Sequence, residues 1–528
     1  NAAARMRQHL ASPQKRGLRS IRVVVDDTYN KSVCLDLESH LIRWLAGDGR
    51  YAVLNGNEGI IDAAYYDRES YRQSFREIFE EFRAEGLFER SIPQIENSDL
   101  FKLSPFKALT RDQAIAVESL LDDLLSDLVP TESEVRTSVV QGHPGTGKTI
   151  VAIFLMKLLA DIRDYADEDD IDPDSVFSEY FVPENRERLV GFRMALVVPQ
   201  QSLRLSIRKV FRKTPKLHPA MVLSPFDVGK SPEPFDLLIV DETHRLNRRA
   251  NQPTGVLNKA FGEINRTLFG TDDPTFTQLD WITSQSANQI FLLDEAQSVR
   301  PADLPISRLR ALVDGARAEH RHHVLASQMR VRAGTDYVDF LRVVLAPVPQ
   351  AIARPDFGEY DLQFFDDLAA MQKAIRQRDQ EHGLARLVAG YAWDWKSRKD
   401  PEAFDIELDG LSLRWNSTDK DWINSPGSLN EVGSIHTVQG YDLNYAGVVI
   451  GPELGFDPAA GAITFDRDAY RDKKGKESNG KPKHVYTDAE LLQYVLNIYR
   501  VLLSRGIRGT YVYVCDPALR DHLRRYFG

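Results

Sequence analysis

The sequence predicts an α/β fold with two parallel-sheet lobes and a small α/β segment before them. Three observations lead to this fold class. From about Ser104 onward, short β-branched runs alternate with longer amphipathic stretches, as in parallel strands connected by helices. The chain has 528 residues, which is more than a single compact core holds. The runs are numerous enough for two sheets, and we expect the boundary between the two lobes at Arg300-Pro301.

The individual elements follow from the same patterns. Seven runs are expected to be strands: Thr137–Gln141, Met194–Val198, Leu237–Val240, Gln289–Leu293, Leu384–Ala389, Val448–Ile450 and Tyr511–Cys515. The segment before Ser104 is expected to hold a strand over Ile21–Val25 and helices over Val33–Leu45 and Arg68–Glu85. Loops are expected over Asp161–Asp174, Asn247–Asp280 and Lys473–Lys483. The predicted domains are residues 1–95, 96–300 and 301–528.

Composition places the chain among ordinary globular proteins, with 42% hydrophobic and 27% charged residues. No apolar run is long enough to cross a membrane, and no apolar signal-peptide core precedes the first elements. The two cysteines, Cys34 and Cys515, lie far apart and suggest neither a disulfide framework nor a zinc site. A reducing cytoplasm is the simplest location for such a chain.

The net charge of −10 argues at first against a nucleic-acid partner. Charge is unevenly distributed, however, because Asp161–Asp174 is acidic while Arg204–Lys216 and Arg467–Lys483 are basic. A basic groove on an acidic body is therefore compatible with the composition. Each run by itself is equally well explained as a solvated face or loop.

A phosphate-binding loop is indicated by Gly142-His-Pro-Gly-Thr-Gly-Lys-Thr149, which follows a β run and precedes a helical one. Its glycines, which allow backbone N–H groups to surround phosphates, are Gly142, Gly145 and Gly147. Lys148 is expected to reach the β- and γ-phosphates of ATP, and Thr149 to hold Mg²⁺. A chance glycine-rich turn is the alternative, and the strand–loop–helix setting makes it the weaker one.

A second acidic signal accompanies the loop. Phe235–Glu242 reads FDLLIVDE, an apolar strand that ends in two carboxylates. We expect Asp241 to hold the Mg²⁺ shell and Glu242 to polarise the attacking water. A strand that ends in Asp-Glu is common by itself, and it gains weight from the loop upstream.

Two further elements belong with this site. Gln113, in Leu109-Thr-Arg-Asp-Gln113, has an amide suited to the N6/N7 edge of adenine, although a helix cap by Thr110 explains the pattern nearly as well. Phe291-Leu-Leu-Asp-Glu-Ala-Gln297 repeats the apolar-then-acidic form. Gln297 is expected to contact the γ-phosphate or its water, whereas Asp294 can also be read as a strand-end cap.

These motifs in this order resemble superfamily 1 helicases, most specifically the Schlafen group-3-like DNA/RNA helicase domain. The resemblance covers roughly Ser104 to the end, about four-fifths of the chain. Three later motifs are the discriminating ones: Leu325-Ala-Ser-Gln-Met-Arg330, Glu431-Val-Gly-Ser-Ile-His-Thr-Val-Gln-Gly440 and Asn497-Ile-Tyr-Arg-Val-Leu-Leu-Ser-Arg505. The resemblance implies two RecA-like lobes, ATP and Mg²⁺ as cofactors, and DNA or RNA as partner.

It also implies roles for second-lobe residues. Arg330 and Arg505 would complete the ATP site, with Arg505 as the arginine finger. Gln439 and Gly440 would bind nucleotide and couple the two lobes. Cationic groups that reach the phosphates only when the cleft closes would let hydrolysis move a bound strand in steps.

The strand is expected to lie across both lobes. Val197-Val-Pro-Gln-Gln-Ser202 resembles the first-lobe motif that contacts the nucleic-acid backbone, so Gln200, Ser202 and the basic run after them are candidates for holding phosphates. Four tryptophans are candidates for base stacking, with core packing as the favoured alternative: Trp393, Trp395, Trp415 and Trp422.

Two departures from the family limit the expected activity. The tetrad that begins at Asp241 ends in His244, where some relatives carry arginine or aspartate. Nothing in the sequence resembles the large inserted subdomains of processive unwinding enzymes. Translocation or protein displacement is therefore expected over robust unwinding.

The N-terminal residues resemble the later two-thirds of a GIY-YIG nuclease domain. Arg5 and His9 lie one helical turn apart, Glu38 precedes a Leu-Ile pair, and Asn55 follows a strand-like run. The resemblance implies that Arg5 supports the phosphate and Glu38 binds a metal ion. Its tyrosine-bearing strands would precede Asn1, so we expect the chain to be a fragment without its natural start. A small appendage without chemistry is the alternative.

Three functions are compatible with these residues. The first is an ATP-driven motor on DNA or RNA. The second is a nucleotide-switched signalling or assembly ATPase, which would have no need of the later motifs. The third is a motor fused to a nuclease.

Overall fold

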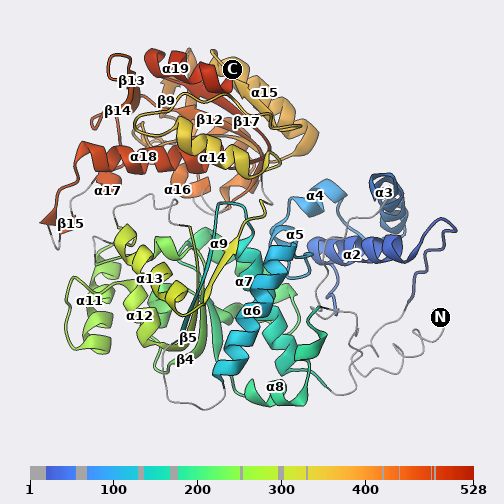
Figure 1. The fold of residues 1–528 in the computed structure, drawn as a ribbon. Coiled ribbons are helices and arrows are strands. Elements are labelled where there is room, and N and C mark those ends of the chain that lie inside the picture. Colours follow the sequence, from blue (N-terminus) through green and yellow to red (C-terminus); the bar gives the residue numbers. More distant parts are fainter. Residues whose placement is uncertain are drawn as a thin grey trace. The chain divides into compact units, whose positions relative to one another are not determined.

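The computed structural model describes residues 20–54, 68–128, 136–166, 176–249, 252, 254–294, 302–328, 331–418, 421–438, 441–476, 479–480 and 483–528 (Figure 1). The chain forms two compact units. The first comprises residues 1–129, 153–192 and 210–218, and the second comprises residues 130–152, 193–209 and 219–528. None of the described helices is both long and apolar enough to cross a membrane.

The regular secondary structure in the described part of the first unit is helical. Its helices are α2 (Lys31–Asp48), α3 (Arg68–Ala84), α4 (Ile92–Glu96), α5 (Asp99–Lys102), α6 (Arg111–Asp127), most of α7 (Lys148–Arg163) and α8 (Pro183–Arg188). Asn30 caps the start of α2 and Gly49, in the left-handed region, ends it. Aromatic residues form the small core, in which the rings of Trp44 and Phe79 meet edge-on at 5.1 Å.

The predicted strand over Ile21–Val25 is wrong. These residues are exposed, Val25 to 83%, and no described residue pairs with them. β-branched composition favours an extended backbone, but a strand forms only where a neighbour takes its backbone hydrogen bonds. The helices predicted over Val33–Leu45 and Arg68–Glu85 are confirmed as α2 and α3.

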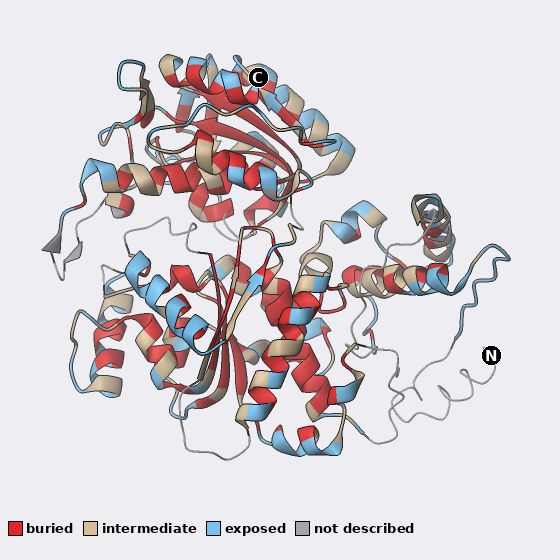
Figure 2. Ribbon diagram, in the orientation of Figure 1, coloured by how far each residue is buried: buried red, intermediate tan, exposed pale blue. Residues whose placement is uncertain are grey.

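The second unit contains a six-stranded, fully parallel sheet with the order β3-β2-β4-β5-β1-β6. Its strands are β1 (Arg136–Gly142), β2 (Met194–Val197), β3 (Val222–Leu223), β4 (Phe235–Val240), β5 (Ser286–Leu293) and β6 (His322–Leu325). Helices α9 (Gln201–Lys213), α10 (Pro225–Gly229), α11 (Gly255–Phe269), α12 (Gln278–Ser284) and α13 (Ile306–Ala318) accompany it. Its central strands are buried along their length, which explains their continuous apolar runs (Figure 2).

The predicted lobe boundary at Arg300-Pro301 falls inside this first lobe. β6 comes after the boundary, yet it pairs with β1 from Val139 opposite His322 to Gly142 opposite Leu325. α13 also packs into the core of the same sheet through Leu309 and Val313. The first sheet therefore ends at Leu325.

Two of the predicted loops contain regular structure. Asn247–Asp280 holds α11 and the start of α12, which are anchored where the rings of Phe261 and Trp281 meet at 4.3 Å. Lys473–Lys483 contains α17 (Lys473–Lys476) and the short strand β15 (Asn479–Gly480), which pairs with β16 (Lys483–His484). In the acidic stretch, α7 continues to Arg163, and residues 167–175 lie outside the described residues.

A seven-stranded sheet forms the second lobe, in the order β7-β17-β12-β8-β11-β10-β9. Only the β9–β10 pair is antiparallel. The strands are β7 (Asp361–Phe364), β8 (Ala385–Ala389), β9 (Ile406–Leu408), β10 (Leu411–Trp415), β11 (Glu431–Ser434), β12 (Leu443–Ile450) and β17 (Gly506–Val514). β13 (Leu454–Asp457) and β14 (Ala462–Phe465) form a separate hairpin. All seven strands predicted from apolar runs are confirmed in the two sheets.

The helices of the second lobe are α14 (Gly334–Val344), α15 (Leu368–His382), α16 (Ile435–Val438), α18 (Asp488–Leu503) and α19 (Pro517–Phe527). α18 is almost entirely apolar on one side and contributes Val495, Leu496, Ile498 and Tyr499 to a large core of the second lobe. This helix carries the motif that ends at Arg505, so the core fixes the position of that motif.

Candidate nucleotide site

The phosphate-binding loop connects β1 to α7, as predicted. Gly145 and Gly147 have φ angles of 88° and 80°, in the region that favours glycine. A Cβ atom at Gly142 would collide with the hydroxyl of Thr146. Each of the three glycines therefore meets a backbone or packing requirement of the loop.

Lys148 lies inside the loop and is 6% exposed. Its ammonium donates to the carbonyl oxygens of Gly142 at 2.7 Å and His143 at 3.1 Å. The cation is thus held at the centre of the turn, where backbone N–H groups and the start of α7 also favour an anion.

The side chains of Thr149, in the first turn of α7, and Asp241, directly after β4, come together. The Thr149 hydroxyl donates to Asp241 Oδ2 at 2.6 Å, and the carboxyl group of Asp241 is fully buried. Burial, and then the nearby charge of Glu242, raises the pKa of Asp241 to about 6. A buried carboxylate beside a hydroxyl offers hard oxygen ligands, so this pair fits Mg²⁺, which needs few protein ligands when phosphates and water supply the others.

Glu242 follows directly and has left-handed backbone angles, φ 52° and ψ 43°. Its Oε2 lies 3.0 Å from His244 Nε2, although the two groups are not aligned as a hydrogen bond. Burial opposes ionisation of Glu242, but the contact with His244 and the charge of Arg245 outweigh it and lower the pKa of Glu242. The pKa values of the two adjacent acids therefore differ, with that of Asp241 raised and that of Glu242 lowered. Glu242 is the one held as an anion.

The Leu325–Arg330 motif begins where the first sheet ends. Gln328 Nε2 donates to the carbonyl oxygen of Pro144 at 2.7 Å, so this motif contacts the phosphate-binding loop. Arg330 itself lies outside the described residues, as does Gln297. Their predicted contacts with the phosphates stay predictions.

Arg505 is 2% exposed, and two of its hydrogen bonds go to backbone carbonyls of its own lobe. Its Nε donates to the carbonyl oxygen of Val501 at 3.1 Å and its Nη1 to that of Tyr441 at 3.3 Å. Tyr441 directly follows Gln439 and Gly440, which lie outside the described residues. Arg505 thus connects the end of α18 to the segment that the motif of Gln439 leads into, and its action as an arginine finger stays a prediction.

Comparison with known proteins places these motifs in a family. A family model described as Schlafen group 3, DNA/RNA helicase domain, matches residues 136–516, well over half of the chain. The chain belongs to this family. The match begins at β1, so it covers both sheets of the second unit and begins later than the Ser104 start inferred from the sequence.

The individual proteins that this chain is similar to have low sequence identity to it. An uncharacterised protein of Saccharomyces cerevisiae, YPL245W, is 26% identical over 467 residues, which cover 82% of this chain and 94% of that protein. The crystal structure of arterivirus nonstructural protein 10, a helicase, is 13% identical with a TM-score of 0.28, over 74% of this chain and 62% of that one. Bacteroides Pif1 bound to single-stranded DNA is 10% identical with a TM-score of 0.27, over 80% of this chain and 97% of that one. The chain spans about three-fifths of the arterivirus helicase it matches.

Gln113 lies in the first unit, at the third position of α6. Its Oε1 accepts a hydrogen bond from the Thr110 N–H at 3.0 Å, in a capping box with Thr110. The helix-cap explanation of this pattern is therefore confirmed, and the contact with adenine stays a prediction.

Two arginines of the basic run on α9 brace the first lobe of this helicase-family fold. Arg204 donates to the carbonyl oxygen of Val198 at 2.6 Å, and Arg208 donates twice to that of Val222. Gln200 Oε1 accepts from Arg245 at 3.0 Å. Arg204 and Arg208, which the charge pattern alone would assign to phosphates, are therefore engaged with the protein itself, and so is Gln200.

The tryptophans divide into two pairs. Trp415 and Trp422 are 1% and 0% exposed, so core packing is correct for both and base stacking is excluded. Trp393 and Trp395 are partly buried against the same sheet, and the guanidinium of Arg398 lies 5.6 Å from the Trp395 ring. Only the second pair keeps surface available to a nucleic acid.

Of the predicted nuclease-like residues, Glu38 lies among the residues that the structure describes. Glu38 is exposed on α2, and no cluster of three or more His, Cys, Asp and Glu able to hold a metal ion occurs within the described ranges. The neighbouring Asp36 instead pairs with Arg68, at 3.0 Å. Arg5, His9 and Asn55 lie outside the described residues.

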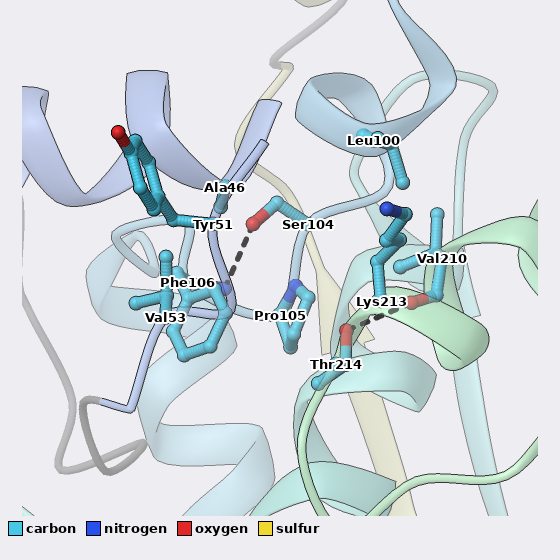
Figure 3. Close-up of a pocket in the computed structure, with 10 residues that line it drawn as sticks. All are labelled: Ala46, Tyr51, Val53, Leu100, Ser104, Pro105, Phe106, Val210, Lys213 and Thr214. Carbon is cyan, nitrogen blue, oxygen red and sulfur yellow. Dashed lines mark hydrogen bonds between the residues drawn. The ribbon is translucent and has the colours of Figure 1, made fainter. Parts of the chain in front are cut away.

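A small pocket in the first unit is separate from these motifs (Figure 3). Its polar groups are satisfied within the protein, because Ser104 Oγ accepts from the Phe106 N–H at 3.1 Å and the Thr214 hydroxyl donates to the Val210 carbonyl at 2.9 Å. It has room for little more than a water molecule, so it is not a ligand site.

Sequence reasoning missed one contact at the loop. Arg342 Nη2, from α14, lies 2.8 Å from His143 Nδ1, the second residue of the phosphate-binding loop. Arg342 stands in an ordinary amphipathic helix with no motif around it, and its partner is 199 residues away. No sequence signal could have found this pair.

Proposed function

We propose that this chain is an ATP-driven motor on DNA or RNA. The observation that carries the proposal is the hydrogen bond between Thr149 and Asp241, made beside Lys148 in the glycine loop. This arrangement joins a phosphate cradle, a cation and hard oxygen ligands at one place, which phosphoryl transfer requires. Membership of a DNA/RNA helicase domain family supports nucleic acid as the partner.

Each described residue has a distinct part in the proposed hydrolysis. Lys148 would bind the β- and γ-phosphates, and Thr149 and Asp241 would hold Mg²⁺, which neutralises charge on those phosphates when bound. Glu242, an anion at the strand end, would orient the attacking water. Guanidinium groups of the second lobe would stabilise the transferring phosphoryl group.

The motor differs from a nucleotide switch in one measurable respect. A motor binds its strand through both lobes, so the strand changes the rate of ATP turnover. A nucleotide-switched signalling or assembly ATPase, the alternative, would hydrolyse ATP at a rate indifferent to nucleic acid. The family's helicase-type second lobe favours the motor.

Steady-state ATP turnover with and without single-stranded DNA and RNA tests this proposal. We expect at least one strand to raise turnover about tenfold or more, with Lys148→Ala as the inactive control. If ATP turnover is the same with DNA, with RNA and without either strand, the motor is excluded and the nucleotide-switched ATPase is the function that stands. Displacement of a protein from a strand, compared with unwinding of a forked duplex, then separates translocation from unwinding.

The nuclease-like role of residues 1–95 is a separate proposal that rests on the sequence resemblance. A form with tyrosine-bearing strands ahead of Asn1 is expected to nick plasmid DNA with Mg²⁺. Glu38→Ala in that form should stop nicking and spare ATP turnover, because the two sites belong to different domains. Unchanged nicking by Glu38→Ala would make the exposed Glu38 a surface residue.

A further inference from the structure

Two arginines of the second lobe meet at the end of α14, and one of them contacts the phosphate-binding loop. Arg342, on α14, contacts His143 through Nη2, and its Nη1 lies 3.4 Å from Asp339 on the same helix. Arg500, on α18, donates to the carbonyl oxygen of Leu345, which lies three residues after Arg342. Both arginines lie in the second compact unit together with the loop.

The contact with His143 fixes the state of the imidazole. A guanidinium only donates hydrogen bonds, so Nδ1 of His143 must be the acceptor and the ring must be neutral with its proton on Nε2. Burial, and then the charge of Arg342, lowers the pKa of His143, which keeps the ring neutral near pH 7. The other charged groups around the ring are Asp294, Asp339 and Lys148.

Arg500 is mostly buried without a counter-ion. Its Nη1 donates to Asn497 Oδ1 at 2.8 Å and its Nη2 to the Leu345 carbonyl at 2.8 Å, while Nε makes no hydrogen bond. Within the described parts of the chain, no carboxylate lies within ion-pair distance of it. Burial and the charge of Arg342 lower the pKa of Arg500 to about 10, so it remains a cation at neutral pH.

Two neighbouring cations at a phosphate-binding loop are costly unless an anion joins them. A buried charge without a partner destabilises a protein, and a neighbouring like charge adds to the cost. An anion between them would remove both costs and satisfy the free Nε of Arg500. The anion that the proposed function brings to this loop is the terminal phosphate of a nucleotide.

We propose that Arg342 and Arg500 form a second-lobe anion site for the γ-phosphate, and that His143 holds Arg342 until a triphosphate binds. This inference rests on the proposed ATP site and adds a specificity role for two arginines other than Arg330 and Arg505: Arg342, outside the helicase motifs, and Arg500, within the motif that ends at Arg505. In the absence of a γ-phosphate, Arg342 stays on the neutral imidazole. When a triphosphate binds, Arg342 exchanges the imidazole for a phosphate oxygen.

The arrangement predicts discrimination between triphosphate and diphosphate. Binding of ATPγS and of ADP, each with Mg²⁺, would be measured for the wild type, Arg342→Gln and Arg500→Gln. Arg525→Gln is the matched control, because Arg525 is an exposed arginine of α19. We expect each test variant to lose about tenfold or more in affinity for ATPγS, the loss typical of one charge-assisted hydrogen bond, and less than about twofold for ADP.

His143 supplies the decisive comparison because it acts in the opposite direction. His143→Leu removes the competing acceptor, so the preference for ATPγS over ADP should rise severalfold. His143→Asn, whose Oδ1 can stand in for Nδ1, should bring the preference back toward the wild-type value. If the His143–Arg342 contact only stabilised the fold, His143→Leu and Arg342→Gln would change the preference for ATPγS over ADP in the same direction. That result would overturn the proposal.

ADP binding separates this proposal from the one it rests on. If the wild type binds neither nucleotide, the ATP site itself is wrong. If it binds both but Arg342→Gln and Arg500→Gln weaken ATPγS and ADP equally, or weaken neither, the γ-phosphate site is wrong while the ATP site stands. Retained ADP binding in the variants also shows that they are folded.

Discussion

Glu453 is a buried acid in the second lobe whose ionisation should cost stability. It follows β12 and is 0% exposed. Its Oε1 accepts a hydrogen bond from the Tyr499 hydroxyl at 2.5 Å, and that hydroxyl accepts from the Gly451 N–H at 2.8 Å. Its Oε2 makes no hydrogen bond. Burial raises the pKa of Glu453 to about 7, against the opposing effect of the Tyr499 hydrogen bond.

The size and sign of the effect follow from this pKa. The folded state holds the proton up to about pH 7, whereas an unfolded glutamate releases it near pH 4.5. The folded state therefore binds more protons across this window, and stability falls as pH rises through it. At about 1.4 kcal/mol for each pH unit, the loss totals about 3 kcal/mol above pH 7.

Glu453→Gln tests this reasoning, because glutamine keeps an acceptor for Tyr499 and does not titrate. Urea unfolding followed by tryptophan fluorescence between pH 5 and pH 8 reports on this lobe, which holds four of the six tryptophans. The new amide adds a constant offset, so only the change with pH is diagnostic. We expect the variant to gain about 2.5 kcal/mol on the wild type between pH 5 and pH 8, because part of the total loss has already occurred at pH 5. Parallel pH profiles would refute the buried-acid argument, and Glu359→Gln, at an exposed glutamate, should give such parallel profiles.

The nucleotide site yields three further predictions. Lys148→Ala should abolish ATP hydrolysis because the phosphates lose the cation at the centre of the loop, and measurable strand-stimulated turnover would contradict this. Glu242→Gln should bind ATPγS but turn over about 10²-fold or more slowly, and near-normal turnover with nucleic acid present would remove Glu242 from the reaction. Arg505→Ala should cost about 10³-fold or more in turnover with nucleotide affinity largely kept, and a loss confined to affinity would contradict the arginine-finger role.

The fold was predictable where burial is complete and was missed at the edges. The seven predicted strands are short and largely apolar, such as Leu237–Val240, because both faces of a central parallel strand are covered. β6 reads His-His-Val-Leu and lies at the edge of its sheet, where Val324 is 58% exposed. An edge strand needs no apolar face on both sides, so its pattern is weak. The misplaced lobe boundary follows from missing this one strand.

The candidate site shows the same division between local and long-range information. The loop from Gly142 to Thr149 was predictable because its glycines, lysine and threonine are contiguous and each has a local reason. His143 and Arg342 are 199 residues apart, and nothing around Arg342 marks it as a partner of the loop. Charge pattern also cannot distinguish a cation for phosphates from one that braces a carbonyl, which is why the role of Arg204 and Arg208 was not foreseen.

Helix α18 and the motif at its end connect three separate segments of the second lobe. Tyr499 binds Glu453 after β12, Arg500 binds the carbonyl of Leu345 after α14, and Arg505 binds the carbonyl of Tyr441. Three segments of the lobe are therefore tied to one helix whose apolar side is fixed in the main core. A close-packed core transmits displacement because it cannot deform continuously. A phosphate that attracts Arg500 would thus move the segment following Gln439 and Gly440 together with α18, which is the coupling that a motor needs between its nucleotide and its strand.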